Sequence, residues 1–270
     1  MELACATRKT HNTKIQCNGS IEIGNRTFHC WWRKGHGATS TKKALATSCD
    51  IFFYQIALQL SMQDLIDISE EFMLDIQHNT LPIKSSYHKA FKKYHNYNQG
   101  DVIVNTIGQG HWQISPLGIL NIISTIANNG VINPLYIVKN IKYNNINISP
   151  KNSSNPLKVL DYPEEDFQLV KSALRDSVRK RYGTSWYMNT HIPNWGLSAK
   201  TGTAQIVTLD SEYKDIKRNR DNSLAVGFLP YHNPKYAITI ILEHEGFAAM
   251  SIPPIMKSVV KALKDRDSLY

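Results

Sequence analysis

Residues 198–207, Ser-Ala-Lys-Thr-Gly-Thr-Ala-Gln-Ile-Val, constrain the fold of this chain more than any other stretch. Their pattern predicts an exposed β-strand that opens on Lys200, Thr201, Gly202 and Thr203. An ammonium group and two hydroxyl groups place several hydrogen-bond donors along one strand edge. Gly202 has no side chain, so we expect a ligand backbone to approach closely there. Such an edge suits an extended peptide that adds as an extra strand and ends in a carboxylate.

Composition excludes some classes of protein. Apolar residues make up 42% of the 270 residues, which is enough for a packed core and unlike a disordered chain. The formal net charge of +9 fits an anionic partner, but the positive residues are scattered and form no basic helix with interleaved aromatic residues. Nucleic acid is therefore not an expected ligand.

Targeting signals are also missing from the sequence. No apolar run approaches the ~18 residues that a membrane span requires, and the N-terminus does not resemble a signal peptide. The chain taken alone is therefore expected to remain cytoplasmic. This expectation reverses if the chain is a fragment whose export signal lies upstream.

The expected elements run from helices to three neighbouring strands and a closing helix. After a short hairpin within residues 15–32, helical spacing and caps predict helices at residues 40–47, 51–60, 61–72, 116–128, 162–178 and 253–264. Strands are expected at 136–141, 198–207, 223–230 and 235–244, with irregular connections at 77–100 and 142–160. This order predicts an α+β fold whose antiparallel sheet is flanked by helices.

Ser48-Cys49-Asp50 lies in the expected break between two helices and forms one constellation with the Lys200 strand. In this order and separation, the two motifs resemble the serine acyltransferases that bind penicillin, whose signatures are S-x-x-K, S-x-N or S-x-D, and K-T-G. The resemblance extends along nearly the whole chain through Trp32-Arg-Lys-Gly-His-Gly37, Ala44-Leu45, Phe52-Phe-Tyr-Gln55, Gly108-Gln-Gly110 with Ser115-Pro116, and Lys200-Thr-Gly-Thr-Ala-Gln205. On these residues the chain resembles the penicillin-binding protein 2 family, the class B transpeptidases of wall elongation in rod-shaped bacteria.

The resemblance implies a fold of the β-lactamase and D,D-peptidase type, and an acyl transfer. A serine would attack the D-Ala–D-Ala bond of a peptidoglycan stem peptide, and the acyl group would pass to an amine of a neighbouring strand; β-lactams are the other implied ligand. Ser48 and Asp50 would lie beside the acylation site, with Ser48 in the proton relay. A backbone N–H of the Lys200 strand, near Thr203, would form half of an oxyanion hole. The substrate carboxylate would be held by Lys200, Thr201, Gly202 and Thr203.

The family also implies a location and partners. Its members act at the periplasmic face of the bacterial inner membrane. Membrane proteins of the elongation complex are the implied partners, in addition to the peptidoglycan stem peptide.

One part of the family signature is missing. The nucleophile of S-x-x-K belongs several dozen residues before S-x-D, whereas only 47 residues precede Ser48. Matches at Ser40…Lys43, Ser86…Lys89 and Ser211…Lys214 fall in loops or in a turn too close to Ser48. We therefore expect residues 1–270 to be an N-terminally truncated, partial transpeptidase domain that is inactive alone, with the missing upstream fragment as a partner. The alternative is a catalytically dead remnant, or one piece of a split gene, that at most binds a partner.

Cys17, Cys30, His36 and Cys49 form a second constellation. These residue types suit a tetrahedral Zn²⁺ site, although their spacing is wider than in a zinc finger. A Cys17–Cys30 disulfide and a merely buried Cys49 are the alternatives. The family resemblance favours zinc, because penicillin-binding protein 2 sequences carry acidic or thiol ligands and a histidine at such positions. A zinc-stabilised binding module is thus a further class of function; Cys5 lies outside the pattern.

Other candidate groups are expected to be structural. We expect packing from His111-Trp112, a solvated turn from Glu243-His244-Glu245, and a solvated face from the charged loop at residues 210–222. The aromatic side chains between a helix and a loop are expected to form a packing cluster; they are Tyr182, Trp186 and Tyr187.

Overall fold

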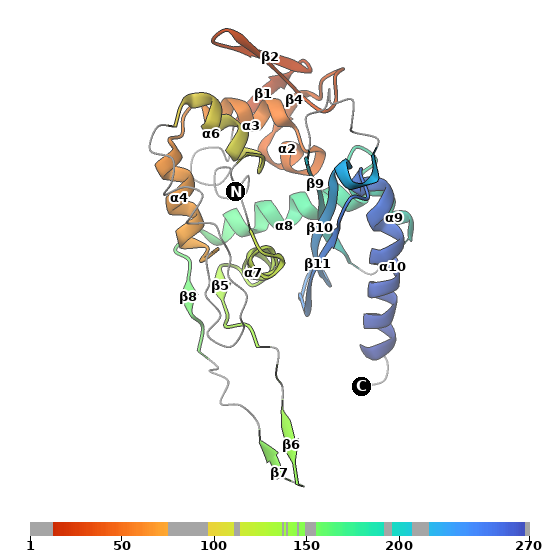
Figure 1. The fold of residues 1–270 in the computed structure, drawn as a ribbon. Coiled ribbons are helices and arrows are strands. Elements are labelled where there is room, and N and C mark those ends of the chain that lie inside the picture. Colours follow the sequence, from red (N-terminus) through yellow and green to blue (C-terminus); the bar gives the residue numbers. More distant parts are fainter. Residues whose placement is uncertain are drawn as a thin grey trace.

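The computed structural model describes residues 13–74, 97–110, 114–136, 138, 140–144, 146–148, 155–191, 196–206 and 216–267. A three-stranded antiparallel sheet carries helices on both faces, with further helices beside it and short strands at one end (Figure 1). The expected α+β class with a flanked antiparallel sheet is confirmed. None of the helices in these ranges is both long and apolar enough to cross a membrane.

The main sheet consists of β9 (Ser198–Ala204), β10 (Asn222–Leu229) and β11 (Tyr236–Leu242). Their order is β11-β10-β9, and both pairings are antiparallel, with Lys200 opposite Val226. All three expected C-terminal strands are therefore confirmed, although β9 ends at Ala204. In this order β9 is an edge strand of the sheet.

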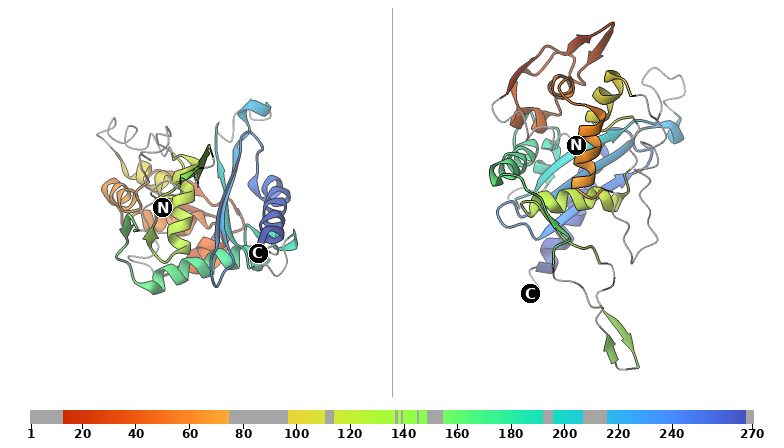
Figure 2. Two further views of the ribbon diagram at one scale, coloured as in Figure 1. Left: turned by 90° about the horizontal axis from the view of Figure 1, so that it is seen from below. Right: turned by 90° about the vertical axis from the view of Figure 1, so that its left-hand side faces the viewer.

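Helices cover both faces of this sheet (Figure 2). On one face lies α10 (Ala248–Asp267), beside the short α9 (Trp186–His191); on the other lie α7 (Pro116–Ala127) and α8 (Glu164–Arg179). The predicted start of the last helix at Pro253 is wrong, because α10 contains its two prolines inside the helix. Buried contacts on either side of the prolines, made by Ile252 and Met256, stabilise the helix where proline alone would end it.

The N-terminal helices are α2 (Thr41–Thr47), α3 (Asp50–Ala57) and α4 (Met62–Glu71). All three were expected, and the side chains of Ser40 and Ser61 accept backbone N–H bonds that cap α2 and α4. The next helix, α6 (Gln99–Thr106), is a correction to the sequence analysis. Residues 75–96 of the expected loop lie outside the described residues.

Short strands surround the predicted hairpin near the N-terminus. The hairpin is β2 (Ser20–Ile23) with β3 (Arg26–His29), whereas β1 (Lys14–Cys17) pairs with β4 (Gly37–Ser40). The hairpin is thus enclosed by a second antiparallel pair that joins residues 20 to 26 positions apart. Long-range pairing of this kind has no local sequence signal.

The expected strand at residues 136–141 and the irregular connection at 142–160 are corrected by the structure. A hairpin of β6 (Ile141–Tyr143) and β7 (Ile146–Ile148) projects from the molecule (Figure 1). At its base, β5 (Val131–Ile132) pairs with β8 (Lys158–Val159). Polar composition hid these strands, because the asparagines of the stretch are poor strand formers.

Phe228 links the sheet to the helical part of the molecule. Its side chain is fully buried in β10 and belongs to the same apolar core as Phe52 and Phe53 of α3. That core therefore depends on a large side chain supplied by the sheet.

We predict that Phe228→Ala lowers the free energy of unfolding by about 3–5 kcal/mol, because it leaves a cavity at the junction of helices and sheet. Phe247 is 58% exposed, so Phe247→Ala is the matched control and should change stability by less than about 0.5 kcal/mol. Urea denaturation of both variants measures the difference, and equal stabilities would contradict the packing described here.

Candidate active site

The Lys200 side chain of β9 meets the Ser48 side chain between α2 and α3. The Lys200 Nζ donates to the Ser48 Oγ over 2.5 Å and to the Thr201 carbonyl over 2.8 Å. Ser48 has φ +52°, a left-handed conformation that costs a non-glycine residue about 1–2 kcal/mol. Such strain is typical of functional positions held by their surroundings. The structure thus unites the two motifs that sequence analysis linked.

The residues that follow Lys200 in the strand are less exposed than expected, and they are buried to different extents. Thr201 is buried, whereas Gly202 and Thr203 are half-buried. A side chain at position 202 would meet Leu224 at 2.7 Å, so close packing within the sheet already requires this glycine. The Thr203 carbonyl accepts a 2.9 Å bond from Nε2 of Gln109, which attaches the strand to the Gly108–Gly110 segment. Gln109 is a contact residue that sequence analysis did not single out.

A chain of hydroxyl groups leads inward from Ser48. Its Oγ lies 3.4 Å from the Thr184 Oγ1, which lies 3.5 Å from the Ser177 Oγ. The Ser177 hydroxyl donates to Ser185 over 3.1 Å, and the Ser185 hydroxyl donates to the Ala199 carbonyl of β9. The contacts therefore run from Ser48 back to the residue before Lys200.

Sequence analysis missed Thr184 and Ser177. The available signal was Gly183, because a Cβ there would lie 2.1 Å from the Ser177 carbonyl oxygen. Only glycine allows the turn that brings Thr184 under Ser48. A Gly-Thr-Ser run after a helix is typical of a tight turn, and this run is the local sequence signal for Thr184.

Asp50 contacts the loop that precedes β4. Its carboxylate accepts a 2.8 Å bond from the backbone N–H of Trp31, in the loop before β4. The indole N–H of Trp31 in turn donates to the Thr47 carbonyl over 2.9 Å. Asp50 therefore connects this loop to the turn that contains Ser48.

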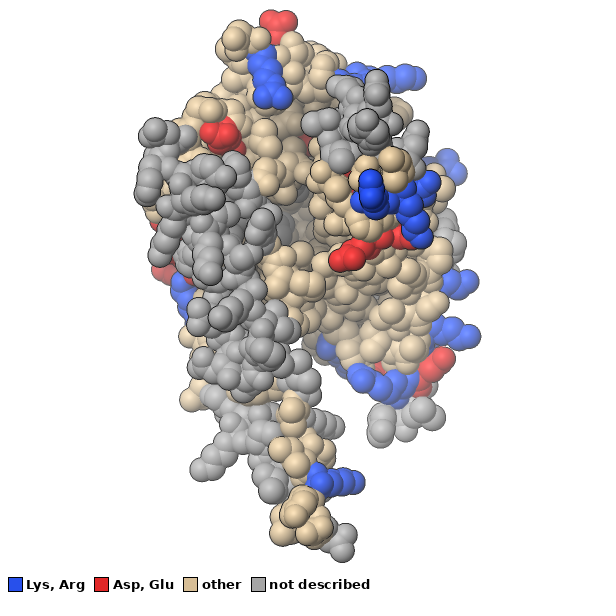
Figure 3. All heavy atoms as spheres, in the orientation of Figure 1, with Lys and Arg blue, Asp and Glu red and all other residues tan. Residues whose placement is uncertain are grey.

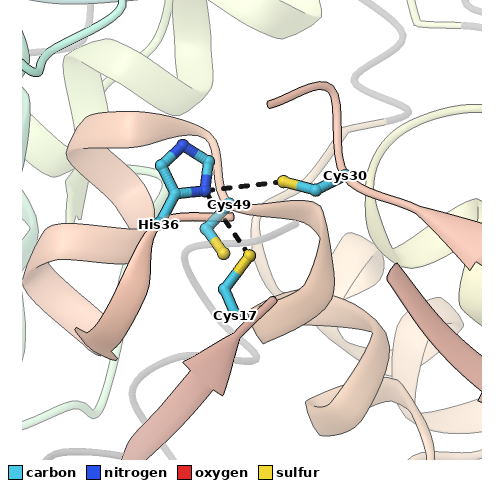
Figure 4. A group of neighbouring side chains, drawn as sticks. All are labelled: Cys17, Cys30, His36 and Cys49. Atoms are coloured by element: carbon cyan, nitrogen blue, oxygen red, sulfur yellow. Dashed lines mark hydrogen bonds between the residues drawn. The ribbon is translucent and has the colours of Figure 1, made fainter. Parts of the chain in front are cut away.

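The second constellation forms a compact cluster (Figure 4). One donor atom from each of Cys17, Cys30, His36 and Cys49 lies within 4.8 Å of the others, and all three cysteines are free thiols. The His36 Nδ1 lies 3.7 Å from the Cys17 Sγ and 3.5 Å from the Cys30 Sγ. A tetrahedral zinc site has a nitrogen–sulfur separation of about 3.6 Å, from metal bonds of about 2.0–2.1 Å and 2.3 Å. The donor types and these separations fit zinc.

Electrostatics favours a thiolate in this cluster. The pKa of Cys30 is lowered to about 3, mainly by its hydrogen bond with Cys49 and further by His36. The same hydrogen bond, together with burial, raises the pKa of Cys49 far above its ordinary value. One proton shared by two buried sulfur atoms gives the cluster an anionic ligand.

The S-x-x-K matches within the described residues have their serine or lysine engaged in other contacts. Ser40 caps α2, and the Lys43 Nζ donates to the carbonyls of His36 and Ala38. Sequence analysis overlooked two further matches, Ser177…Lys180 and Ser258…Lys261. Ser177 belongs to the hydroxyl chain, and the Ser258 hydroxyl donates to the Pro254 carbonyl within α10. The matches at Ser86 and Ser211 lie outside the described residues.

The remaining candidates lie away from this cleft or outside the described ranges. His111-Trp112 and Cys5 are outside them. The Glu243-His244-Glu245 segment is a turn after β11 in which Glu245 pairs with Lys217 of the 3₁₀ turn η1 (Lys217–Asn219) over 3.7 Å. Tyr182 and Tyr187 are exposed, and Trp186 is half-buried.

The basic side chains on the face drawn in Figure 3 lie at several separate places, in agreement with the scattered charge of the sequence.

Comparison with known proteins identifies the family. The family model for the penicillin binding protein transpeptidase domain matches residues 4–261. The chain belongs to this family. Peptidoglycan D,D-transpeptidase MrdA of Salmonella typhimurium is 29% identical in an alignment 259 residues long that covers 89% of this chain and 40% of the relative. MrdA of Escherichia coli K12 is 26% identical in an alignment 272 residues long that covers 93% of this chain and 41% of the relative. This penicillin-binding domain thus spans about two fifths of the length of these relatives.

Solved structures support the same assignment. The penicillin-binding protein PBP2 of Helicobacter pylori, solved in complex with MreC, has a TM-score of 0.79 and 25% identity over 97% of this chain and 47% of that chain. Pseudomonas aeruginosa PBP2 in complex with WCK 5153 also has a TM-score of 0.79, at 22% identity over 97% and 56%. The resemblance to penicillin-binding protein 2 and the expected transpeptidase-type fold are confirmed.

We predict that Thr184→Val destabilises the domain by about 1 kcal/mol, because the buried Ser177 hydroxyl loses a neighbour while side-chain volume is kept. Thr184→Ser retains the hydroxyl and is the matched control, with a smaller loss. Urea denaturation compares the two variants. A Thr184→Val variant as stable as Thr184→Ser would show that the hydroxyl chain contributes nothing.

Proposed function

We propose that Lys200 and the strand that carries it, next to Ser48, bind the carboxylate end of a D-Ala–D-Ala stem peptide, or of a β-lactam, in a peptidoglycan D,D-transpeptidase. The observation that carries this proposal is the contact between the Lys200 ammonium and the Ser48 hydroxyl, which joins the two family motifs. Names of the relatives support it, since the MrdA proteins are peptidoglycan D,D-transpeptidases.

In this proposal the Lys200 strand binds and orients the ligand. The Lys200 ammonium attracts the terminal carboxylate, and a charge-assisted hydrogen bond of this kind is stronger than a neutral one. An extended peptide adds alongside β9, which is an edge strand, with Thr201, Gly202 and Thr203 at its side. The backbone N–H of Thr203 supplies half of an oxyanion hole.

Ser48 serves as a proton relay. The Ser48 hydroxyl accepts a hydrogen bond from the Lys200 ammonium and lies within hydrogen-bond distance of the Thr184 hydroxyl. It can therefore receive a proton from Lys200 while it donates its own proton to a neighbouring group. Asp50 acts indirectly, because its carboxylate holds Trp31 and thereby the turn that contains Ser48. This role for Asp50 is compatible with the position beside the acylation site that the resemblance implies.

The acyl transfer also needs a nucleophilic serine activated by a neighbouring base. We propose that no described serine fills this role: Ser40 and Lys43 are engaged at the start of α2, and Ser177 is buried. The chain alone then binds ligands without forming an acyl-enzyme, and a second polypeptide supplies the nucleophile. A catalytically dead remnant that only binds a partner is the alternative.

We predict that fluorescent penicillin incubated with the 270-residue chain leaves no label after denaturing electrophoresis, because none of the S-x-x-K pairs among the described residues contacts Lys200 or Ser48 through its lysine. Zinc content and cooperative unfolding of the same sample serve as controls for its folding. A labelled band that persists, and whose label maps to a serine of this chain, would contradict the missing nucleophile. Ser48→Ala and Ser40→Ala then identify the serine responsible.

A structural zinc ion is a second proposal for this chain, supported by the spacing and the chemistry of its cysteine and histidine donors. Cys17, Cys30, His36 and Cys49 would hold it, and it would supply the cross-link between β1, the loop before β4 and the turn at Ser48. Cys49 is the residue next to Ser48, so the metal would fix the backbone of the proposed relay. The Cys17–Cys30 disulfide is less favoured, because both thiols are free.

We predict near-stoichiometric zinc in the purified chain and a large fall in melting temperature after chelation, because metal binding is coupled to folding. His36→Asn should lower zinc content, whereas His29→Asn is the matched control, since His29 is an exposed residue of β3. Elemental analysis and thermal unfolding give the result. Purified folded protein without zinc, or equal metal content in both variants, would contradict this proposal.

The partners and location of the whole protein are part of the proposal. A structure of Helicobacter pylori PBP2 in complex with MreC supports an elongation-complex partner for this chain. Peptidoglycan as a substrate places the assembled protein at the periplasmic face of the inner membrane.

A further inference from the structure

Two neighbouring indoles lie exposed beside the candidate active site. Trp31 and Trp32 are 48% and 45% exposed, and their ring centroids lie 5.8 Å apart at an interplanar angle of 53°. We call these two side chains the tryptophan pair. Large aromatic side chains are commonly buried in cores or interfaces, so an exposed pair is an unusual surface feature.

The tryptophan pair is held in place by its surroundings. Both N–H groups of Trp31 are bonded, the backbone group to Asp50 over 2.8 Å and the indole group to the Thr47 carbonyl over 2.9 Å. The Trp32 carbonyl accepts from Gly35 over 2.9 Å, which closes a turn. The backbone that carries the pair is therefore fixed, and a ligand would order few additional groups on binding.

Two glycines bring this loop against the strand before it. A Cβ on Gly19 would lie 2.0 Å from the Arg33 carbonyl oxygen, and a Cβ on Gly35 would lie 2.2 Å from the Cys17 carbonyl oxygen. Both residues also have positive φ, which glycine tolerates without strain. Close packing thus continues from the cysteine cluster to the indoles.

The tryptophan pair adjoins the proposed substrate cleft. Thr47, which accepts the indole hydrogen bond, directly precedes Ser48. Strands β1 and β4 lie at the end of the molecule where α2 and β9 meet (Figure 1). Arg33 and Lys34 follow the pair and are exposed, so positive charge lies next to the indoles in the sequence.

We propose that the tryptophan pair binds the glycan strand that carries the stem peptide. The C–H faces of pyranose rings pack against the electron-rich faces of indoles, while Arg33 and Lys34 can donate hydrogen bonds to the acyl carbonyl oxygens of an amino-sugar polymer. This inference rests on the proposed function, because the peptide in the cleft brings its own glycan next to the pair. A protein partner fits less well, since two indoles followed by charges form a small patch compared with the ~800 Å² that each side of a stable interface buries.

NMR titration of the 270-residue chain tests this proposal with two probes. The first is the N-acetylglucosamine hexamer, and the second is the peptide diacetyl-Lys-D-Ala-D-Ala. We expect Trp32→Ala to weaken hexamer binding about tenfold and to leave peptide binding unchanged, because only one of two stacking faces near the cleft is removed. Trp32→Tyr keeps an aromatic face and should bind the hexamer nearly as the original chain does. Tyr143→Ala removes an aromatic side chain that is 67% exposed on the projecting hairpin and is the matched control.

The outcomes separate this inference from the proposed function. Peptide binding without hexamer binding, or equal hexamer affinity in Trp32→Ala and the original chain, overturns the glycan proposal and leaves the cleft proposal standing. Hexamer binding that depends on Trp32, without peptide binding, supports the glycan proposal and overturns the cleft proposal. Unchanged thermal unfolding of Trp32→Tyr and retained peptide binding in Trp32→Ala confirm that the variants are folded.

Discussion

The contact between the Lys200 ammonium and the Ser48 hydroxyl is the interaction on which the rest of the site depends. It joins residues 152 positions apart and lies where the edge strand of the sheet meets the turn between two helices. The contact forms only when the sheet that carries Lys200 and the helices that flank Ser48 are both in place. The sheet orients Lys200 through its pairing with β10, while α2 and α3 present Ser48 in a strained left-handed conformation.

Several independent contacts keep Ser48 in that conformation. Thr184 lies under its hydroxyl, and the backbone of Thr184 donates to the Ala46 carbonyl over 3.1 Å. On the other side, Asp50 and Trp31 attach the turn to the loop that carries His36. The cysteine cluster then joins this loop to Cys49. A proton relay benefits from such support, because catalytic groups act only when their geometry is fixed before the ligand arrives.

Local sequence signals predicted much of this arrangement and failed where long-range packing decides. Alternation of apolar residues predicted the three sheet strands, and the residue types of the cysteine cluster predicted a common site. Helix α6 was missed because Gly100 and the β-branched residues of this short segment are weak helix formers, and tertiary packing overrides that preference. The pairing of β1 with β4 and the contact of Asp50 with Trp31 join segments whose proximity no local pattern reveals.

The central claim is that Lys200 recognises a ligand carboxylate in this cleft, and a comparison of two ligands tests it most directly. Diacetyl-Lys-D-Ala-D-Ala carries the carboxylate, and its C-terminal amide lacks the charge but keeps the shape. NMR titration gives Kd for both ligands with the original chain and with Lys200→Gln. The account predicts that Lys200→Gln weakens binding of the acid about tenfold or more and leaves binding of the amide nearly unchanged. Equal losses for the two ligands, or no loss for either, would contradict it.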